Sequence, residues 1–395
     1  MNVRVFKGQL VRSDRVESGS VVVRDGRIAE ILPEGAPLPP HSEVVDAGDG
    51  YIAPGYIDLH VHGGGGGDFM DGTRDAFERA LRANVRHGTT RLAATTTVAR
   101  HDQILATLQL AREFRQSPLA DGSRVMGAHF YGPYFRYEAR GAHPGAEVRP
   151  PILAEYSQYL EFADDLVTAT VAPEISGARE FALACRERGV RTNVGHSWAT
   201  FDQMTQAVEW GVRHVDHLFC AMSDKSKLRQ FQMYPMQGGV LEATLYYDEL
   251  TTEVIADGKH LDANLLLLAL KFKGPDRLAL VSDCSRALDM PDGRYVIGPL
   301  DGGEPLVKKD GVGMLPDLTA LASSVEGMDH MVQTFHRLTK RPVWEVIRMA
   351  SLTPATIAGH ASDVGSIDRG KRADLLVLDR ELNVQSVQID GQRVV

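Results

Sequence analysis

The chain has 395 residues, 43% of them hydrophobic and 24% charged, and its formal net charge at pH 7 is −9. This composition excludes a disordered chain, and a chain of this length can bury a large core without disulfides. The acidic balance and the lack of a basic run argue against a nucleic-acid binder, because such proteins depend on neutralising phosphates.

Three features bear on location. The longest purely apolar run, Leu265 to Leu270, is far shorter than the ~20 residues of a membrane span. The N-terminal segment MNVRVFKGQLVRSD lacks the apolar core of a signal peptide. Three cysteines, Cys185, Cys220 and Cys284, cannot form a disulfide framework. We therefore expect a cytoplasmic protein that binds neither membranes nor nucleic acid.

Residues 1–55 and residues 361–395 have the same character. Both segments contain short β-rich runs with Asp-Gly punctuation, and Asp25-Gly26 stands where a hairpin turn would be. Two β-rich ends around a different middle predict one small β-sandwich domain built from both termini.

Residues 56–360 alternate apolar runs with amphipathic, helix-like segments. Strands that alternate with helices indicate βα units and a parallel sheet. Eight such units in ~300 residues fit a TIM-like (β/α)8 barrel better than an open sheet. The predicted fold class is therefore α/β, and residues 290–318 are expected to form a hairpin insertion and a loop. The eight strand candidates are YIDLHVHG, TTRLAATTTV, RVMGAHFYG, LVTATVAPE, VRTNVGHS, RHVDHLF, LTTEVIADGKH and RLALVSDCS.

Several of these strand candidates end in residues that can bind a metal ion. The first contains His60 and His62, and the period-two alternation of a strand places both on one face. His196 ends the fifth candidate, His217 the sixth and Asp283 the eighth. Chemistry in a barrel sits at these strand ends, so the ordered set of five predicts a site for Zn²⁺ or a similar cation. The simpler alternative is a barrel that keeps these histidines for packing alone.

Asp283 has a second role available. A carboxylate beside a metal ion can take the proton of an attacking water and later give it to the leaving group. The ion makes that water reactive by lowering its pKa from about 15.7 towards ~7. The expected reaction is hydrolysis of an amide, or of a C–N bond in a base.

A series of motifs in fixed order carries a family resemblance. The metal-ligand pattern and the β domain from both termini resemble the amidohydrolase superfamily. The local motifs are similar to those of the N-acetylglucosamine-6-phosphate deacetylase family, and the resemblance covers nearly the whole chain. The motifs are APGYIDLHVHGGGGGDFMD (53–71), GAHFYGPYF (127–135), TVAPE (170–174), VGHS (194–197), HLFCAMS (217–223), IADGKH (255–260) and LVSD (280–283).

The chain departs from this family at the third strand. The family has a metal-ligating glutamate where this sequence has Tyr131, and a neutral phenol is a much poorer ligand than a carboxylate. This change disfavours two ions and leads us to expect one divalent ion per chain, Zn first, with Fe, Mn, Co or Ni as alternatives. Glu174 ends the fourth strand and could reach inward, but the family has a glutamate there too.

Other departures concern the substrate. Cys220 replaces the family's asparagine, and Leu228 stands where an arginine meets the sugar phosphate, with Arg229 one place later. The backbone N–H groups of Ala221 and Met222 can still bind phosphate, which needs donors rather than a particular side chain.

Two further histidines match substrate-contacting positions of the family. His143 corresponds to a histidine in the loop after the third strand, and His260 corresponds to the family's substrate histidine. Either residue could instead be a solvated loop residue. The resemblance also implies a homodimer in which Arg229 or His260 serves the neighbouring pocket.

Three functions follow as hypotheses. The leading one is a metal-dependent hydrolase that converts N-acetylglucosamine-6-phosphate to glucosamine-6-phosphate and acetate, with Asp283 as the catalytic residue. The second is an amidohydrolase or deaminase with one metal ion and a different substrate. The third is a non-catalytic homologue that binds a sugar phosphate.

Overall fold

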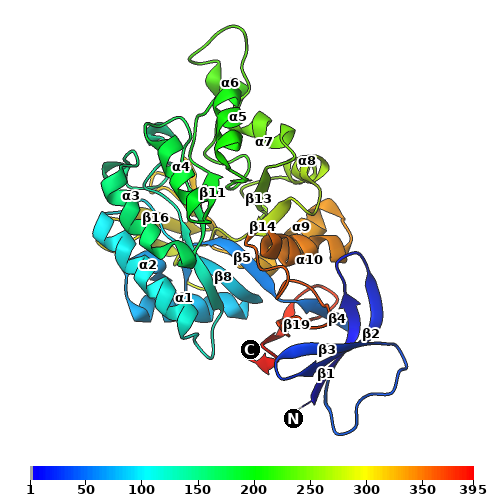
Figure 1. Cartoon of the computed structure of the whole chain (residues 1–395). Coiled ribbons are helices and arrows are strands. Elements are labelled where there is room, and N and C mark those ends of the chain that lie inside the picture. Colours follow the sequence, from blue (N-terminus) through cyan, green and yellow to red (C-terminus); the bar gives the residue numbers. More distant parts are fainter. Residues whose placement is uncertain (1–2) are drawn as a thin grey trace.

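The computed structural model describes residues 3–395, which form a barrel with a second β unit beside it (Figure 1). The barrel wall is one sheet of eight parallel strands in the order β14-β13-β12-β11-β10-β9-β8-β5. All eight predicted strands are present, and the predicted fold class is confirmed. The strands are β5 (Tyr56–Val61), β8 (Thr89–Thr95), β9 (Arg124–Phe130), β10 (Leu166–Thr170), β11 (Arg191–Val194), β12 (His214–Val215), β13 (Thr251–Ile255) and β14 (Leu278–Val281).

The barrel closes where the first strand meets the last. The backbone N–H of Asp283 donates to the carbonyl oxygen of His60 at 2.8 Å. Just below, the Ser282 hydroxyl donates to Asp58 Oδ2 at 2.5 Å, and Asp58 is fully buried. These contacts join segments more than two hundred residues apart, and they set the HxH motif beside Asp283.

Helices connect the strands and cover the outside of the barrel (Figure 1). Their ends follow the usual capping chemistry: Thr73 caps α1 by accepting from Ala76 N, and Asp262 caps α8. The helices are α1 (Arg74–Arg86), α2 (His101–Gln116), α3 (Leu153–Tyr159), α4 (Ala178–Glu187), α5 (Phe201–Trp210), α6 (Lys225–Leu228), α7 (Val240–Tyr246), α8 (Ala263–Lys273), α9 (Met328–Thr339), α10 (Val343–Ala350) and α11 (Leu352–Ile357). No helix among residues 3–395 combines the length and apolar character that crossing a bilayer requires.

Strands from both termini form a separate seven-stranded sheet, as predicted. Its order is β21-β20-β19-β4-β1-β2-β3, and it is mixed because β1 and β4 run parallel. Asp25 and Gly26 both have left-handed backbones, with φ of 50° and 76°, as a two-residue hairpin turn between β2 and β3 requires. The strands are β1 (Val3–Val11), β2 (Val16–Arg24), β3 (Arg27–Pro33), β4 (Glu43–Pro54), β19 (Leu375–Leu378), β20 (Val384–Ile389) and β21 (Gln392–Arg393).

Several contacts tie this terminal sheet to the barrel, and two of them bear on the site. Strand β4 ends at Pro54 and continues after one residue into β5, the strand that carries the HxH motif. Arg91 on β8 also forms a salt bridge of 2.6 Å with Asp374, which is nearly buried. That residues 1–55 with 361–395 form a domain distinct from 56–360 stays a prediction.

A small antiparallel sheet is inserted after β14, and three of its four strands lie within residues 290–318, the segment predicted as a hairpin insertion and a loop, while β18 lies beyond it. It comprises β15 (Gly293–Ile297), β16 (Glu304–Lys309), β17 (Val312–Met314) and β18 (Leu321–Ser323). Arg286 anchors it, because its guanidinium binds the Asp71 carboxylate at 2.9 and 3.0 Å and the Val296 carbonyl at 2.6 Å. The insertion thereby lies against the mouth of the barrel.

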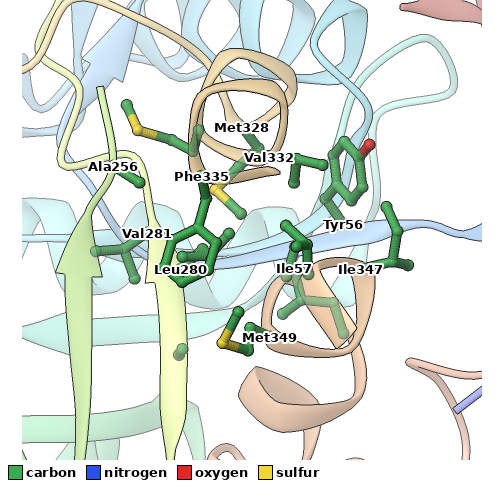
Figure 2. Packing of buried hydrophobic residues seen from close by; sticks show 14 of the residues in the cluster. Tyr56, Ile57, Ala256, Leu280, Val281, Met328, Val332, Phe335, Ile347 and Met349 are labelled. Carbon is green, nitrogen blue, oxygen red and sulfur yellow. The ribbon is translucent and has the colours of Figure 1, made fainter. Parts of the chain in front are cut away.

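A large apolar core lies between the barrel and helices α9 and α10. Figure 2 shows Phe335 of α9 packed against Leu280 and Val281 of β14, with Ile57 of β5 and Ile347 of α10 close by. All five side chains are at most 1% exposed. This core therefore holds together the two strands whose junction closes the barrel.

Truncating this core should lower stability without touching the site. We expect Leu280→Ala to destabilise the protein by about 2–5 kcal/mol, because it removes a fully buried side chain and leaves a cavity. Leu267→Ala, on the exposed face of α8 at 40% exposure, should change stability by less than about 0.5 kcal/mol. Urea denaturation followed by circular dichroism measures both, and equal midpoints for the two variants would contradict the assignment of this core.

Candidate active site

A pocket of about 490 Å³ opens at the carboxyl ends of the barrel strands. Most of the predicted site residues face it, although they come from strands and loops far apart in the sequence. His60 lies beneath the pocket and is fully buried, whereas Arg229 is exposed outside its lining. The predicted residues that line the pocket are His62, His143, His196, His217, Ala221, Met222, His260 and Asp283.

Three predicted metal ligands converge on the floor of this pocket. One ligand atom from each of His60, His62 and Asp283 lies within 4.8 Å of the other two. Asp283 Oδ1 is 3.3 Å from His62 Nε2 and 3.7 Å from His60 Nε2. The His60 Nε2 atom is buried and has no hydrogen-bond partner within the described part of the chain. An unpaired nitrogen facing a carboxylate is what a divalent cation requires, so this group fits a metal ion.

Glu253 on β13 lies directly below His60 and fixes its protonation. Its Oε1 accepts from His60 Nδ1 at 2.6 Å, and its Oε2 accepts from His214 Nε2 at 3.2 Å. A proton held on Nδ1 leaves Nε2 as the ligand atom, the arrangement found when a carboxylate supports a metal-binding histidine. Sequence reasoning missed Glu253. The available signal was a lone charged residue inside a predicted strand, between threonines and apolar residues.

Electrostatics at this floor favour positive charge. Burial alone would lower the pKa of His60, but Glu253 and Asp283 outweigh burial and raise it to about 9, so without a cation this imidazole holds a second proton, on Nε2, which a bound metal ion would replace. Burial alone would raise the pKa of Asp283, but His60 and His62 outweigh burial and lower it. Asp283 is therefore an ionised carboxylate at neutral pH, free to act as a base or as a ligand.

The other two predicted ligands meet Tyr131 instead. The Tyr131 hydroxyl lies within hydrogen-bonding distance of His196 Nε2, and it is 2.7 Å from His217 Nε2. His196 Nδ1 is 2.7 Å from the backbone carbonyl oxygen of Ala139. Burial raises the pKa of Tyr131 well above its usual value, and the nearby Asp283 raises it further, so the phenol stays neutral. Burial lowers the pKa of His196 and His217, so both imidazoles are neutral.

The backbone at three of these strand ends is strained. His196, His217 and Asp283 have positive φ angles of 47°, 21° and 47°, in a region that side chains other than glycine rarely adopt. Each such residue costs about 1–3 kcal/mol and is kept where the surrounding structure enforces it, most often at functional sites. This backbone conformation accompanies the turn of all three side chains from their strands into the pocket.

Two histidines stand higher in the pocket. The Nδ1 atom of His143 pairs with the Thr97 hydroxyl, which leaves Nε2 for a ligand. Burial, with help from the neighbouring histidines, lowers its pKa and keeps it neutral. His260 Nδ1 is 2.7 Å from Asp257 Oδ2. Burial opposes the charged form of His260, but Asp257 outweighs burial and raises the pKa, so this side chain favours a positive charge.

Helix α6 presents a different cation from the one predicted. The Lys227 side chain lines the pocket, with Nζ 4.7 Å from the centre of the Trp198 ring, while Arg229 points outside it. Leu228, between them, is buried. In this chain's own pocket the cation of α6 is thus Lys227, two residues before the predicted Arg229. That Arg229 serves the pocket of a neighbouring chain stays a prediction.

Cys220 and Glu174 are not available for chemistry at this site. Burial raises the pKa of Cys220 to about 12, so this pocket-lining thiol is not a nucleophile at neutral pH. Glu174 accepts a hydrogen bond of 2.7 Å from the Ser197 hydroxyl and another from the Trp198 backbone N–H. Both oxygens of the Glu174 carboxylate are thus engaged, so Glu174 does not replace the carboxylate that is missing at position 131.

Comparison with known proteins identifies the family. Residues 51–394 match the model of the amidohydrolase family. The chain belongs to the amidohydrolase family. This confirms the resemblance seen in the sequence motifs, and it implies a metal-dependent hydrolase that uses a divalent ion.

Three relatives of this amidohydrolase span nearly its whole length. N-acetylgalactosamine-6-phosphate deacetylase of Escherichia coli O157:H7 is 32% identical over 94% of this chain and 93% of its own. The crystal structure of N-acetylglucosamine-6-phosphate deacetylase from Pasteurella multocida has a TM-score of 0.90 at 27% identity, covering 99% of both chains. A mutant N-acetyl-D-glucosamine-6-phosphate deacetylase from Mycobacterium smegmatis, in complex with N-acetyl-D-glucosamine-6-phosphate, has a TM-score of 0.89 at 27% identity, covering 100% of both.

The role of Glu253 can be measured through metal affinity. We expect Glu253→Gln to weaken metal binding about 10–100-fold, because an amide no longer holds the Nδ1 proton of His60 as a carboxylate does. Competition with a chromogenic chelator measures the affinity. The matched control is Glu345→Gln, a buried glutamate on α10 paired with Arg341, which should leave metal affinity unchanged. Equal affinity in both variants would remove Glu253 from the metal site.

Proposed function

We propose that this amidohydrolase deacetylates an N-acetylated amino-sugar phosphate, converting N-acetylglucosamine-6-phosphate to glucosamine-6-phosphate and acetate. The observation that carries the proposal is that one pocket combines a group of metal-binding residues with a group of cations. Its floor brings together His60, His62 and Asp283, and its rim carries the cations Lys227 and His260. The floor suits hydrolysis of an amide, and the rim suits a phosphate. The named activities of the relatives support the same substrate class.

We propose zinc as the metal, one ion per chain, held on the floor of the pocket. His60, His62 and Asp283 supply the nitrogen and oxygen ligands that zinc accepts. When bound, such an ion polarises carbonyl groups and lowers the pKa of water from about 15.7 to about 7.

Asp283 carries the proton in this reaction. As an ionised carboxylate it accepts a proton from the attacking water, whose oxygen forms a bond to the acetyl carbon. The C–N bond then breaks, and Asp283 returns the proton to the departing amine, so that acetate and the free amino sugar result. His143 is neutral and has its Nε2 atom towards the pocket, where it can donate to the acetyl oxygen as negative charge develops.

The phosphate is proposed to bind at the rim. Lys227 and a protonated His260 supply positive charge, and charge-assisted hydrogen bonds to phosphate are stronger than neutral ones. Ala221 and Met222 line the pocket, and among residues 3–395 no backbone carbonyl accepts from either N–H. These two donors are therefore free for phosphate oxygens.

We further propose that the protein is a homodimer in the cytoplasm. Support for a dimer comes from the loop after α6, which projects from the barrel (Figure 1) and exposes Phe231, Met233 and Tyr234 at 66%, 70% and 81%. Exposed apolar side chains gathered on one loop are typical of a protein interface. Support for a reducing compartment comes from the three cysteines, which are all free.

Acetate release tests the substrate directly. The purified protein, loaded in turn with Zn, Mn, Fe and Co, is incubated with N-acetylglucosamine-6-phosphate and with its galactosamine epimer. Turnover of the first supports the proposal, and preference for the epimer moves the substrate to that of the Escherichia coli relative. No acetate from either, with ammonia released from cyclic amidines instead, would replace the proposal with a deaminase.

Asp283 should be indispensable. We expect Asp283→Asn to lower kcat for acetate release by at least ~10²-fold, because the amide cannot accept the proton of the attacking water. The thermal melting temperature should stay within a few degrees of the wild type, which separates lost chemistry from lost folding. Unchanged turnover in a folded variant would sink the proposed mechanism.

Lys227 should act on binding rather than on chemistry. We expect Lys227→Gln to raise KM for the phosphorylated substrate about 10–100-fold with little change in kcat, since it removes a charged partner of the phosphate. Lys225→Gln, on the exposed side of the same helix, is the matched control and should behave as the wild type. Steady-state kinetics with and without the 6-phosphate measures the effect, which the unphosphorylated sugar should not show.

A further inference from the structure

The hydroxyl of Tyr131 occupies the space between two histidines that were predicted as metal ligands. It is 2.7 Å from His217 Nε2 and hydrogen-bonds to His196 Nε2 as well. The ring is 2% exposed and packs edge-on against Phe135 and His60, with ring centres 4.9 and 4.5 Å away. Packing therefore fixes the phenol oxygen at this point.

The hydrogen bond between His196 Nδ1 and the Ala139 carbonyl fixes the direction of the two hydrogen bonds to the Tyr131 hydroxyl. The Ala139 carbonyl can only accept, so His196 Nδ1 carries the proton of that imidazole. A neutral imidazole has one such proton, so His196 Nε2 accepts and the Tyr131 O–H donates to it. Because the phenol has no second proton, His217 Nε2–H must donate to the Tyr131 oxygen. His217 Nδ1 is then the unprotonated nitrogen, and it is buried without a partner in the described part of the chain.

This chain of hydrogen bonds commits both Nε2 atoms. His196 uses its lone pair for the phenol, and His217 uses its nitrogen as a donor, so neither is free for a cation. An ion bound to both would lie about 2.0–2.1 Å from each nitrogen, in the space that the phenol oxygen fills. His60 has the opposite arrangement, because its Nδ1–H donates to Glu253 and its Nε2 has no hydrogen-bond partner in the described part of the chain.

We propose that this chain binds one divalent ion, at His60, His62 and Asp283, and that the Tyr131 phenol, clamped by His196 and His217, fills the place of a second ion. This inference rests on the proposed function in one respect: it concerns the metal ion of the same site. It divides the five ligands predicted from the sequence into three that bind the ion and two that hold a side chain. Three protein ligands leave a position open for water, as catalytic sites require.

Metal content tests the division without any substrate. Elemental analysis after dialysis against excess zinc is expected to give one ion per chain in the wild type. His196→Asn and His217→Asn should each keep that ion with an affinity within about threefold of the wild type, since neither residue contacts it. His60→Asn should lose it. Two ions in the wild type, or loss of the ion in the His196 and His217 variants, would overturn the proposal.

Tyr131→Glu tests whether a second ion can bind once the phenol is replaced by a carboxylate. A carboxylate there, with His196 and His217 released from the phenol, should raise the content to two ions per chain, whereas Tyr131→Phe should keep one. Thermal melting confirms that each variant is folded. A folded Tyr131→Glu protein with a single ion would contradict the proposal.

A spectroscopic measurement covers the case in which Tyr131→Glu does not fold. The wild-type protein loaded with Fe³⁺ should show no visible charge-transfer band of an iron-bound phenolate, because Tyr131 is hydrogen-bonded to two imidazoles and is not a ligand. A band that disappears in Tyr131→Phe would make Tyr131 a ligand and overturn the proposal. These outcomes are independent of acetate release, whose failure would overturn the proposed function and leave the metal count as it stands.

Discussion

The hydrogen bond from the Asp283 N–H to the His60 carbonyl is the contact on which both the fold and the site depend. It joins the ends of the first and last barrel strands, and so closes the cylinder. The same junction places the His60 and His62 side chains against the Asp283 carboxylate, at 3.7 and 3.3 Å. A barrel left open here would lose the metal floor at once, because its ligands come from opposite ends of the sheet. The packing of α9 and α10 across this junction, and the buried pair of Asp58 with Ser282 below it, reinforce it.

A second constraint is the burial of charge inside the barrel. Carboxylates in an apolar interior are tolerated only when paired, and Glu253 meets that condition by binding His60 and His214. The pairing orients His60 and also makes the floor attractive to a cation. Local strain works with it, since His196, His217 and Asp283 have positive φ angles at the strand ends from which their side chains enter the pocket.

Much of this arrangement was predictable from the sequence, because it follows from periodicity and order along the chain. The alternation around His60 and His62 gives their common face, and parallel strands must bring their carboxyl ends to one rim. What could not be predicted depends on contacts across the barrel. Nothing in the sequence indicates that Glu253 pairs with His60. The direction of Lys227, rather than Arg229, depends on where the four residues of α6 begin and end.

The same limit explains Tyr131. In the sequence, Tyr131 stands where the family has a metal-ligating glutamate. The loss of that carboxylate argues by itself only for weaker binding of a second ion. The structure adds that the phenol is held by two imidazoles whose protons run in one direction, from His217 through Tyr131 to His196 and on to the Ala139 carbonyl. Tyr131 thus removes the carboxylate ligand of a second ion, and its hydroxyl fills the place that this ion would take. The histidines remain in place for a physical reason, because without them the buried hydroxyl of Tyr131 would be left unpaired, which costs about 1–3 kcal/mol.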